Sequence, residues 1–206
     1  MEHQQLTASI AVDLSAAFDT VHHQLLLDVL ETSFGVRSKA KQWITSYFTD
    51  RNFEVHVHDS CSDAININFS VPQGSINGPV LFTCYASTLQ YSIGDGINLI
   101  GYADDHNVYA SWKASDSSAE LTTLSRLTST MDNVKRWMHQ NRLKMNDDKS
   151  EFIVFGSTRL LSNCLATDVK VGDIMVSRSN SVKVLGVTLD KNLSLKSRHA
   201  ALALFN

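Results

Sequence analysis

Apolar residues recur at helical spacing along much of the chain, and this pattern predicts several helices. The leucines of residues 22–34 include pairs at helical spacing, and Gly35 is placed to end that helix. Residues 38–50 predict a second helix, one side of which carries Trp43, Ile44 and Tyr47. Pro79 suits the first turn of a third helix, which we expect to run to about Tyr91.

The clearest helical pattern predicts a helix from Ser117 to Gln140. Its apolar stripe consists of Leu121, Leu124, Leu127, Met131, Val134 and Met138. Either Ser115 or Asp116 can cap the first turn, because a short side chain with an oxygen can accept a hydrogen bond from a free backbone N–H there.

Period-two alternation and short apolar runs predict strands elsewhere. These segments are residues 8–14, 53–59, 64–71, 97–103, 106–112, 151–156 and 182–190. The first strand ends at Asp13, and the second and third predict a hairpin. The fourth and fifth flank Asp104 and Asp105, and the last approaches a turn at Asp190. Helices mixed with hairpins indicate an α+β fold with antiparallel pairing.

Composition is that of an ordinary globular protein, and it narrows the function only weakly. The chain has 206 residues, with 43% hydrophobic and 19% charged residues, which allows one sizeable core. The net charge of −3 argues against a free-standing nucleic-acid binder, although carboxylates around a metal ion would also lower it. We place one domain boundary near Ser157, giving regions 1–157 and 158–206, because the segment that follows is polar and irregular.

The cysteines and the N-terminal sequence indicate an intracellular protein with no membrane partner. Cys61, Cys84 and Cys164 lie far apart and form no CxxC pair, which fits a reducing compartment and offers no zinc framework. The N-terminal residues show no signal peptide and no transmembrane run. The last residues, 199–206, form an apolar run that resembles the start of a helix.

Three aspartates are candidates for a metal site. If the strand ending at Asp13 neighbours the hairpin that carries Asp104 and Asp105, all three carboxylates meet at one sheet edge. Such a cluster is unfavourable without cations, and Mg²⁺ prefers oxygen ligands. Two such ions, about 3.5–4 Å apart, support phosphoryl transfer. Adjacent aspartates are also common in exposed turns, so the aspartate pair alone leaves both interpretations open.

Five segments resemble the conserved motifs A to E of reverse transcriptases, in order. They are AVDLSAAFDTVHHQLL, VPQGSINGPVLFTCYASTL, GYADDHNVY, LKMNDDKSEFIVFG and VKVLGVTLD, and they span Ala11 to Asp190. The best likeness is to the enzymes of non-LTR (LINE-type) retrotransposons. The resemblance implies a polymerase palm, in which an antiparallel sheet with a catalytic hairpin packs on helices.

The resemblance also implies metal ligands and a reaction. Asp13 would bind two Mg²⁺ ions, Asp104 would bind the ion that activates the primer 3′ hydroxyl, and Asp105 would be a second, less direct ligand. Mn²⁺ can substitute, and no organic cofactor is implied. The substrates would be a DNA primer, an RNA template and deoxynucleoside triphosphates, and Lys149 would neutralise or protonate the leaving pyrophosphate.

Four further residues match nucleotide-binding positions of the family. Phe18 corresponds to the steric gate that crowds a ribose 2′ hydroxyl, and Gln73 and Gly74 correspond to the loop under the incoming nucleotide. Glycine suits that loop because backbone can approach a ligand closely. Tyr102 would support the catalytic hairpin.

Several departures from the family leave other functions open. Only twelve residues precede Asp13, where a basic fingers region is expected, and the chain ends near motif E, where a thumb should follow. We therefore expect an intact metal triad with poor substrate retention. The alternative is an inactive mobile-element relic that keeps the palm fold. A nucleotide cyclase on a similar palm fits only the paired acids, and the PQGS loop argues against it.

Other ligand-type residues are interpreted more simply. We expect a structural or capping role for Asp19, and surface positions for His22 and His23 at a helix start. His56 and His58 have a spacing that can bind zinc, but no third ligand is evident nearby. Residues 147 and 148 are expected to be solvated turn aspartates.

Overall fold

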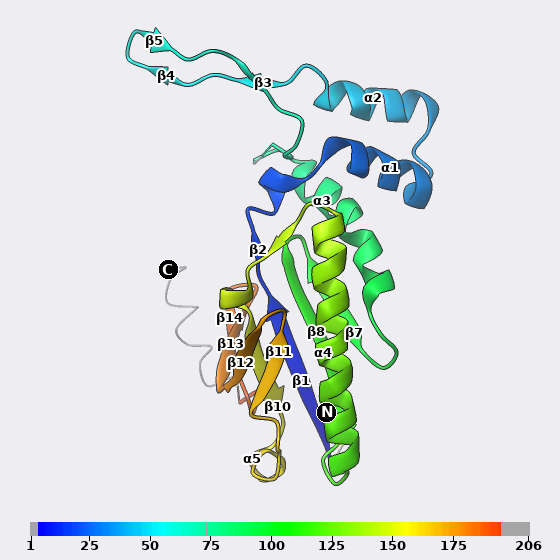
Figure 1. Ribbon diagram of the computed structural model, residues 1–206, viewed down its shortest axis with the longest axis vertical. Coiled ribbons are helices and arrows are strands. Elements are labelled where there is room, and N and C mark those ends of the chain that lie inside the picture. The colour runs from blue at the N-terminus through cyan, green and yellow to red at the C-terminus, as the bar shows by residue number, and fades with distance from the viewer. Residues whose placement is uncertain (1–3, 73, 195–206) are drawn as a thin grey trace.

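A six-stranded sheet and the helices that cover it form the body of the chain (Figure 1). The computed structural model describes residues 4–72 and 74–194. The strand order across the sheet is β11-β12-β10-β1-β8-β7. These strands are β1 Gln5–Val12, β7 Asn98–Tyr102, β8 Asp105–Lys113, β10 Glu151–Phe155, β11 Asp168–Val171 and β12 Ile174–Ser179. The mixed helices and mainly antiparallel sheet confirm the predicted α+β class.

Strand β1 lies in the middle of this sheet and is buried on one face only. Its inward side chains, which are fully buried, are Leu6, Ala8, Ile10 and Val12. Its other face is polar, and there the Thr7 and Ser111 hydroxyls lie 2.8 Å apart across the β1–β8 pair. One face therefore packs on helices and the other stays open.

The long helix α4, Ser117–Gln140, matches its predicted bounds and packs on β8. Asp116 caps it by accepting a hydrogen bond from the Ala119 backbone N–H at 2.9 Å. The predicted stripe is wrong at its first position, because Leu121 is 61% exposed. The neighbouring Glu120 is buried instead.

Three other helices lie toward one end of the sheet (Figure 1). They are α1 His23–Phe34, α2 Ser38–Phe48 and α3 Gly78–Ala86, which continues into the 3₁₀ helix η2 Ser87–Ser92. Gly35 ends α1 as predicted, with a left-handed φ of 67°. Helix α2 packs less than its pattern suggested: Trp43 is 63% exposed, and only Phe48 of this helix is buried.

The predicted hairpin of residues 53–71 is present and projects away from the body (Figure 1). Its pairing is broken into two short ladders: β3 Asn52–Phe53 with β6 Ile65–Asn66, and β4 His56–Val57 with β5 Ser60–Cys61. All these strand residues are exposed. The alternating pattern therefore predicted the strands correctly here, but these strands are not buried.

The segment after Ser157 is more regular than its composition suggested. It contains α5 Thr158–Leu161 and the antiparallel pair β11–β12, and β12 pairs with β10 in parallel. The sheet is thus not purely antiparallel. The division at Ser157 stays a prediction, and the two regions that it separates share one sheet.

The predicted strand at residues 182–190 is instead a small hairpin. Strands β13 Ser181–Val184 and β14 Val187–Asp190 are joined by Leu185 and Gly186, with φ of 48° and 80°. Positive φ at both central residues is the signature of the tight turn that suits a hairpin. Leucine rarely adopts it, so the pattern concealed the turn. The predicted helix start at 199–206 lies outside the described residues.

Two charged side chains of α4 hold the C-terminal strands against it. Glu120 is 3% exposed, and its Oε1 accepts hydrogen bonds from the backbone N–H groups of Leu165 (2.7 Å) and Ala166 (2.8 Å). Lys135 Nζ donates to Asp147 and Asp173, each at 2.8 Å. The prediction that Asp147 is merely solvated is therefore wrong.

Replacing Glu120 with alanine should lower the free energy of unfolding by about 1–3 kcal/mol, because one buried and one partly buried N–H group lose their acceptor. Urea unfolding followed by circular dichroism measures this. Asp132→Ala, at an exposed acidic position on the same helix, is the matched control and should change stability by less than about 0.5 kcal/mol. Equal effects of the two variants would contradict the assigned role of Glu120.

Candidate active site

Strand register brings the predicted carboxylates to one end of the sheet. In the β1–β8 pair Val12 lies opposite His106, so the next residue, Asp13, continues toward Asp105. In the β7–β8 hairpin Tyr102 pairs with Asp105, which leaves Ala103 and Asp104 as a two-residue turn. Asp13 and Asp104 are half-buried, whereas Asp105 is exposed.

The turn that carries Asp104 is supported from beneath by His106. Ala103 takes a φ of 51°, a conformation that a non-glycine residue adopts only when its surroundings hold it. The buried His106 ring donates from Nδ1 to the Asp104 carbonyl oxygen at 3.1 Å. Gly101 makes room for this ring, since a Cβ there would lie 3.0 Å from it. Burial lowers the pKa of His106, which favours a neutral ring.

The motif D turn is attached to Asp13 by backbone pairing. Strand β2, Leu14–Ser15, pairs with β9, Lys144–Met145, and the Asn146 N–H donates to the Asp13 carbonyl oxygen at 2.9 Å. The short helix η3, Asp147–Lys149, follows directly. Lys149 Nζ consequently lies 3.7 Å from Asp13 Oδ2, with its side chain 69% exposed.

A cavity of about 520 Å³ is lined by residues from the segments that resemble motifs A, B and C. Its lining includes Phe18, Pro72, Gly74, Ser75 and Asp104. The Phe18 ring is held against Phe82 of α3, with centroids 5.0 Å apart. Gly74 has a φ of 80° and open space where a Cβ would stand, so backbone conformation favours glycine there. Ser75 Oγ is buried with no hydrogen-bond partner within the described residues, which leaves it able to bond a ligand.

Other predicted residues stand apart from this cavity. Tyr102 is 68% exposed on β7, and Gln73 lies outside the described residues. Within residues 4–72 and 74–194, the three aspartates do not form a group whose ligand oxygens all lie within 4.8 Å of one another. Because these oxygens are farther apart than shared metal ligands would be, the side chains would have to rotate to gather around cations. The cations would then offset the repulsion between the carboxylates. Their donor set is all carboxylate oxygen, which fits Mg²⁺ or Mn²⁺.

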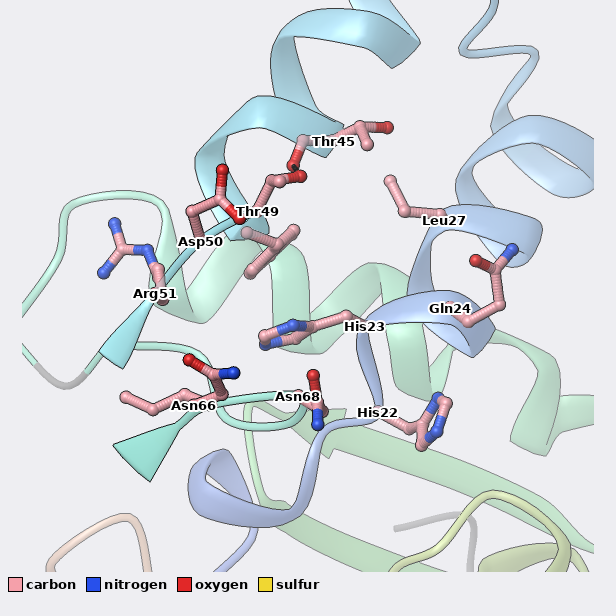
Figure 2. Close-up of a pocket in the computed structure, with 12 residues that line it drawn as sticks. His22, His23, Gln24, Leu27, Thr45, Thr49, Asp50, Arg51, Asn66 and Asn68 are labelled. Atoms are coloured by element: carbon pink, nitrogen blue, oxygen red, sulfur yellow. Dashed lines mark hydrogen bonds between the residues drawn. The ribbon is translucent and has the colours of Figure 1, made fainter. Parts of the chain in front are cut away.

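A second cavity, of about 650 Å³, lies between α1, α2 and the base of the hairpin (Figure 2). His23 points into this region, donates from Nε2 to the Ser70 carbonyl oxygen at 2.8 Å, and stacks on Phe48. The prediction of a surface role for His23 is therefore wrong, and burial lowers its pKa. The hydrogen bond from Nε2 and the contact with the Phe48 ring favour a structural role for His23.

The sequence profile described as "Reverse transcriptase (RNA-dependent DNA polymerase)" matches residues 1–189. The chain is 26% identical over 205 residues to the RNA-directed DNA polymerase from mobile element jockey of Drosophila melanogaster, covering 97% of this chain and 21% of that protein. It is 29% identical over 197 residues to the probable RNA-directed DNA polymerase from transposon BS of the same organism, covering 90% and 20%. The chain thus spans about a fifth of the length of these relatives.

Solved structures with the same fold are telomerases from Candida tropicalis. The apo form truncated from its C-terminal domain gives a TM-score of 0.60 at 13% identity, covering 90% of this chain and 34% of that one. The complex with the TWJ fragment of telomeric RNA gives 0.60 at 12% identity, covering 93% and 30%. The profile match, the mobile-element relatives and the shared fold confirm the predicted resemblance, and the chain belongs to the reverse transcriptase family.

Proposed function

We propose that this chain carries the nucleotidyl-transfer site of an RNA-directed DNA polymerase. One observation supports the proposal above the others: a single cavity is lined by Phe18, Gly74 and Asp104, one residue from each of three motifs. Asp13 and Lys149 lie together beside the same sheet end. In this proposal residues 1–157 form the palm and residues 158–206 the motif E region.

Asp13, Asp104 and Asp105 would hold two Mg²⁺ ions, with Mn²⁺ as a substitute. When bound, the ions would acidify the primer 3′ hydroxyl and stabilise charge on the leaving phosphate oxygens. The hydroxyl attacks the α-phosphorus of a deoxynucleoside triphosphate, and pyrophosphate leaves. Asp13 would contact both ions, and its backbone is held on two sides, by β1 and by the Asn146 N–H.

The remaining residues would select and neutralise the nucleotide. The Phe18 ring packs against Phe82 and lines the cavity, where it would crowd a ribose 2′ hydroxyl. Gly74 and the unpaired Ser75 hydroxyl offer close backbone approach and one hydrogen bond. Lys149 is exposed and adjacent to Asp13, so it can swing toward pyrophosphate and supply a proton or a positive charge. Gln73 would complete this loop.

The partners would be an RNA template, a DNA primer and deoxynucleoside triphosphates. The relatives are named as RNA-directed DNA polymerases, and one structural neighbour was solved with an RNA fragment. Within the described residues, no helix combines the length and the apolar character needed to cross a membrane.

Asp104→Asn should abolish primer extension on an RNA template, lowering the rate at least about 100-fold, because one carboxylate ligand becomes a neutral amide. Extension is measured with Mg²⁺ and then with Mn²⁺, beside the exposed control Asp132→Asn. Mn²⁺ binding followed by electron paramagnetic resonance provides a second readout that needs no turnover. If the parent chain binds Mn²⁺ but does not extend the primer, the inactive relic is favoured. If Asp104→Asn binds Mn²⁺ as the parent chain does, the metal site is refuted.

Phe18→Ala should admit ribonucleotides. Removing the ring opens the cavity beside the sugar, so the preference for deoxynucleotides should fall by about 10-fold or more. Single-nucleotide incorporation with dATP and ATP measures the ratio. Phe34→Ala, which removes an exposed ring from α1, is the control and should leave the ratio unchanged. If Phe18→Ala keeps the parental ratio while still folded, Phe18 is not the sugar gate.

A further inference from the structure

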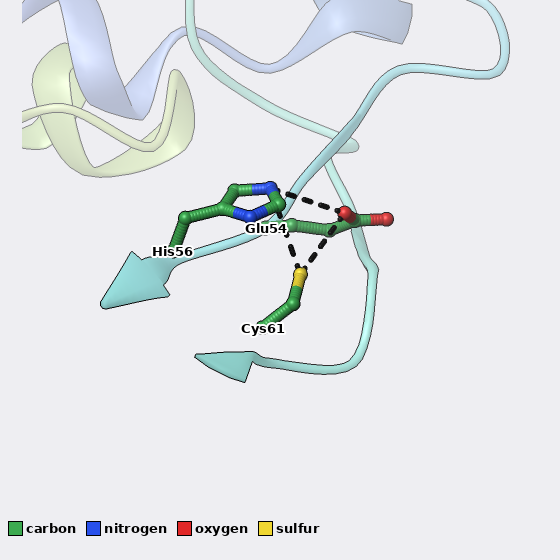
Figure 3. A group of neighbouring side chains, drawn as sticks. All are labelled: Glu54, His56 and Cys61. Carbon is green, nitrogen blue, oxygen red and sulfur yellow. Dashed lines mark hydrogen bonds and ion pairs between the residues drawn. The ribbon is translucent and has the colours of Figure 1, made fainter. Parts of the chain in front are cut away.

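The tip of the projecting hairpin gathers three side chains of different chemistry. Figure 3 shows Glu54, His56 and Cys61 pointing toward one another across the hairpin. His56 and Cys61 are direct partners in the β4–β5 pair, and Glu54 precedes His56 by two residues. The sequence interpretation that no third ligand lies near His56 is therefore wrong. Glu54 comes from the same arm of the hairpin and Cys61 from across the turn, and His58 does not belong to the group.

The spacing of the three ligand atoms fits one tetrahedral ion. Cys61 Sγ lies 3.3 Å from Glu54 Oε2 and 3.6 Å from His56 Nε2, and the latter two atoms are 3.6 Å apart. Zinc bonds of about 2.3 Å to sulfur and about 2.0–2.2 Å to nitrogen or oxygen, at tetrahedral angles, require separations of about 3.3–3.6 Å. One ion could therefore reach all three atoms with the backbone as it stands.

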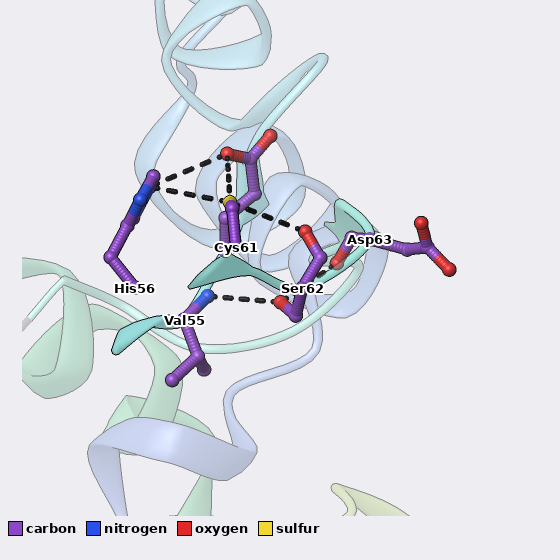
Figure 4. A network of polar contacts seen from close by, with 6 residues as sticks. Val55, His56, Cys61, Ser62 and Asp63 are labelled. Atoms are coloured by element: carbon purple, nitrogen blue, oxygen red, sulfur yellow. Dashed lines mark hydrogen bonds and ion pairs between the residues drawn. The ribbon is translucent and has the colours of Figure 1, made fainter. Parts of the chain in front are cut away.

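Hydrogen bonds next to the cluster hold its two strands in register (Figure 4). The Val55 N–H donates to Ser62 Oγ at 3.0 Å, and the Ser62 N–H donates to the Val55 carbonyl oxygen at 3.0 Å. Ser62 Oγ in turn donates to the Asp63 carbonyl oxygen at 3.1 Å. Val55 follows Glu54 and Ser62 follows Cys61, so this bracing fixes the two ligand positions relative to each other.

Among the described residues, the strands of the hairpin are held by hydrogen bonds and have no packed core. Its strand residues are exposed on both faces, including Phe53, Val57 and Ile65. An isolated two-stranded hairpin is marginally stable in water, and small units with too little core are often held by a structural metal. A cation at the tip would supply a cross-link that packing does not.

The donor set favours zinc over the ions expected at the aspartates. A thiolate and an imidazole are soft or borderline ligands that suit Zn²⁺ and discriminate against Mg²⁺ and Ca²⁺. The hydrogen bond to Glu54 raises the pKa of the Cys61 thiol, so the metal-free site keeps that proton at neutral pH. Metal binding must then displace it.

We propose that Glu54, His56 and Cys61 form a Zn²⁺ site that cross-links the hairpin of residues 52–66, with water as the fourth ligand. Binding forms bonds from zinc to Oε2, Nε2 and Sγ, and releases the thiol proton to solvent. The site is independent of the aspartate cavity and of polymerase activity.

The test is a titration of the purified chain with Zn²⁺ by calorimetry in two buffers of different ionisation enthalpy. We expect one ion per chain and release of about one proton. Cys61→Ser and His56→Ala should each weaken binding at least about tenfold, since even residues outside the ligand shell commonly cost that much. His58→Ala on the same hairpin, and Cys84→Ser elsewhere, are matched controls that should bind as the parent chain does.

Two spectroscopic readouts separate this site from scattered histidine binding. Co²⁺ should give a thiolate charge-transfer band and intense tetrahedral d–d bands that vanish in Cys61→Ser. Amide hydrogen exchange over residues 52–66 should slow with Zn²⁺ in the parent chain and not in that variant. No binding, binding unaffected by Cys61→Ser, or equal loss in His58→Ala would overturn the proposal and leave an ordinary hydrogen-bonded cluster.

Discussion

The pairing of β1 with β8 is the constraint on which the site depends. Its register buries Ile10 and Val12 and sends Asp13 toward the hairpin that carries Asp104. A slip of one residue would turn every buried side chain of β1 to the open face. The hydrophobic core therefore enforces the alignment of the carboxylates, and no interaction among the carboxylates themselves is needed to set it. Their mutual repulsion is opposed by sheet pairing and core packing.

A second set of contacts connects the motif D turn to the same place. The β2–β9 pair brings Lys149 beside Asp13, while Lys135 holds Asp147 from the other side. Gly172 is part of this arrangement: with a φ of 60°, a Cβ there would lie 2.6 Å from Lys135 Nζ. The turn is thus held at its base, whereas the Lys149 side chain is 69% exposed. An exposed side chain on an anchored turn suits the role proposed for Lys149 at the leaving pyrophosphate.

Sequence patterns predicted the parts of this fold that are set locally. Helix α4, the glycine stop of α1 and the existence of the β7–β8 hairpin follow from periodicity, capping and alternation. The turn of that hairpin lies one residue earlier than predicted, at Ala103 and Asp104, and Asp105 belongs to β8. The errors share another cause. Glu120 and His23 are buried polar residues that form hydrogen bonds with backbone groups 45 to 47 positions away in the sequence. No local sequence pattern reveals such a partner. The Leu185 turn and the parallel β10–β12 pair likewise follow from tertiary context.

The site residues divide in the same way. Motif resemblance is the basis for proposing Asp13, Phe18, Gly74, Asp104, Asp105 and Lys149 as site residues, and only Phe18, Gly74 and Asp104 of these line the cavity. The arrangement of Glu54, His56 and Cys61 could not be predicted, because a ligand across a turn depends on hairpin register. Cys61 lies between the predicted strands 53–59 and 64–71, and only the β4–β5 register shows that it faces His56.

The hairpin and the cavity are continuous in the chain, and two backbone hydrogen bonds lie between them. The return arm of the hairpin runs through Ser70 and Val71 into Pro72, which lines the cavity. Before it arrives, the Ser70 N–H donates to the Val21 carbonyl oxygen and the Val71 N–H to that of Phe18, both at 2.8 Å. These two bonds attach the return arm to the segment that carries Val21 and Phe18 before the chain reaches the loop at Gly74. The two proposed metal sites also differ in donor chemistry: oxygen-only ligands at the sheet edge suit Mg²⁺ or Mn²⁺, whereas the sulfur, nitrogen and oxygen set on the hairpin suits Zn²⁺.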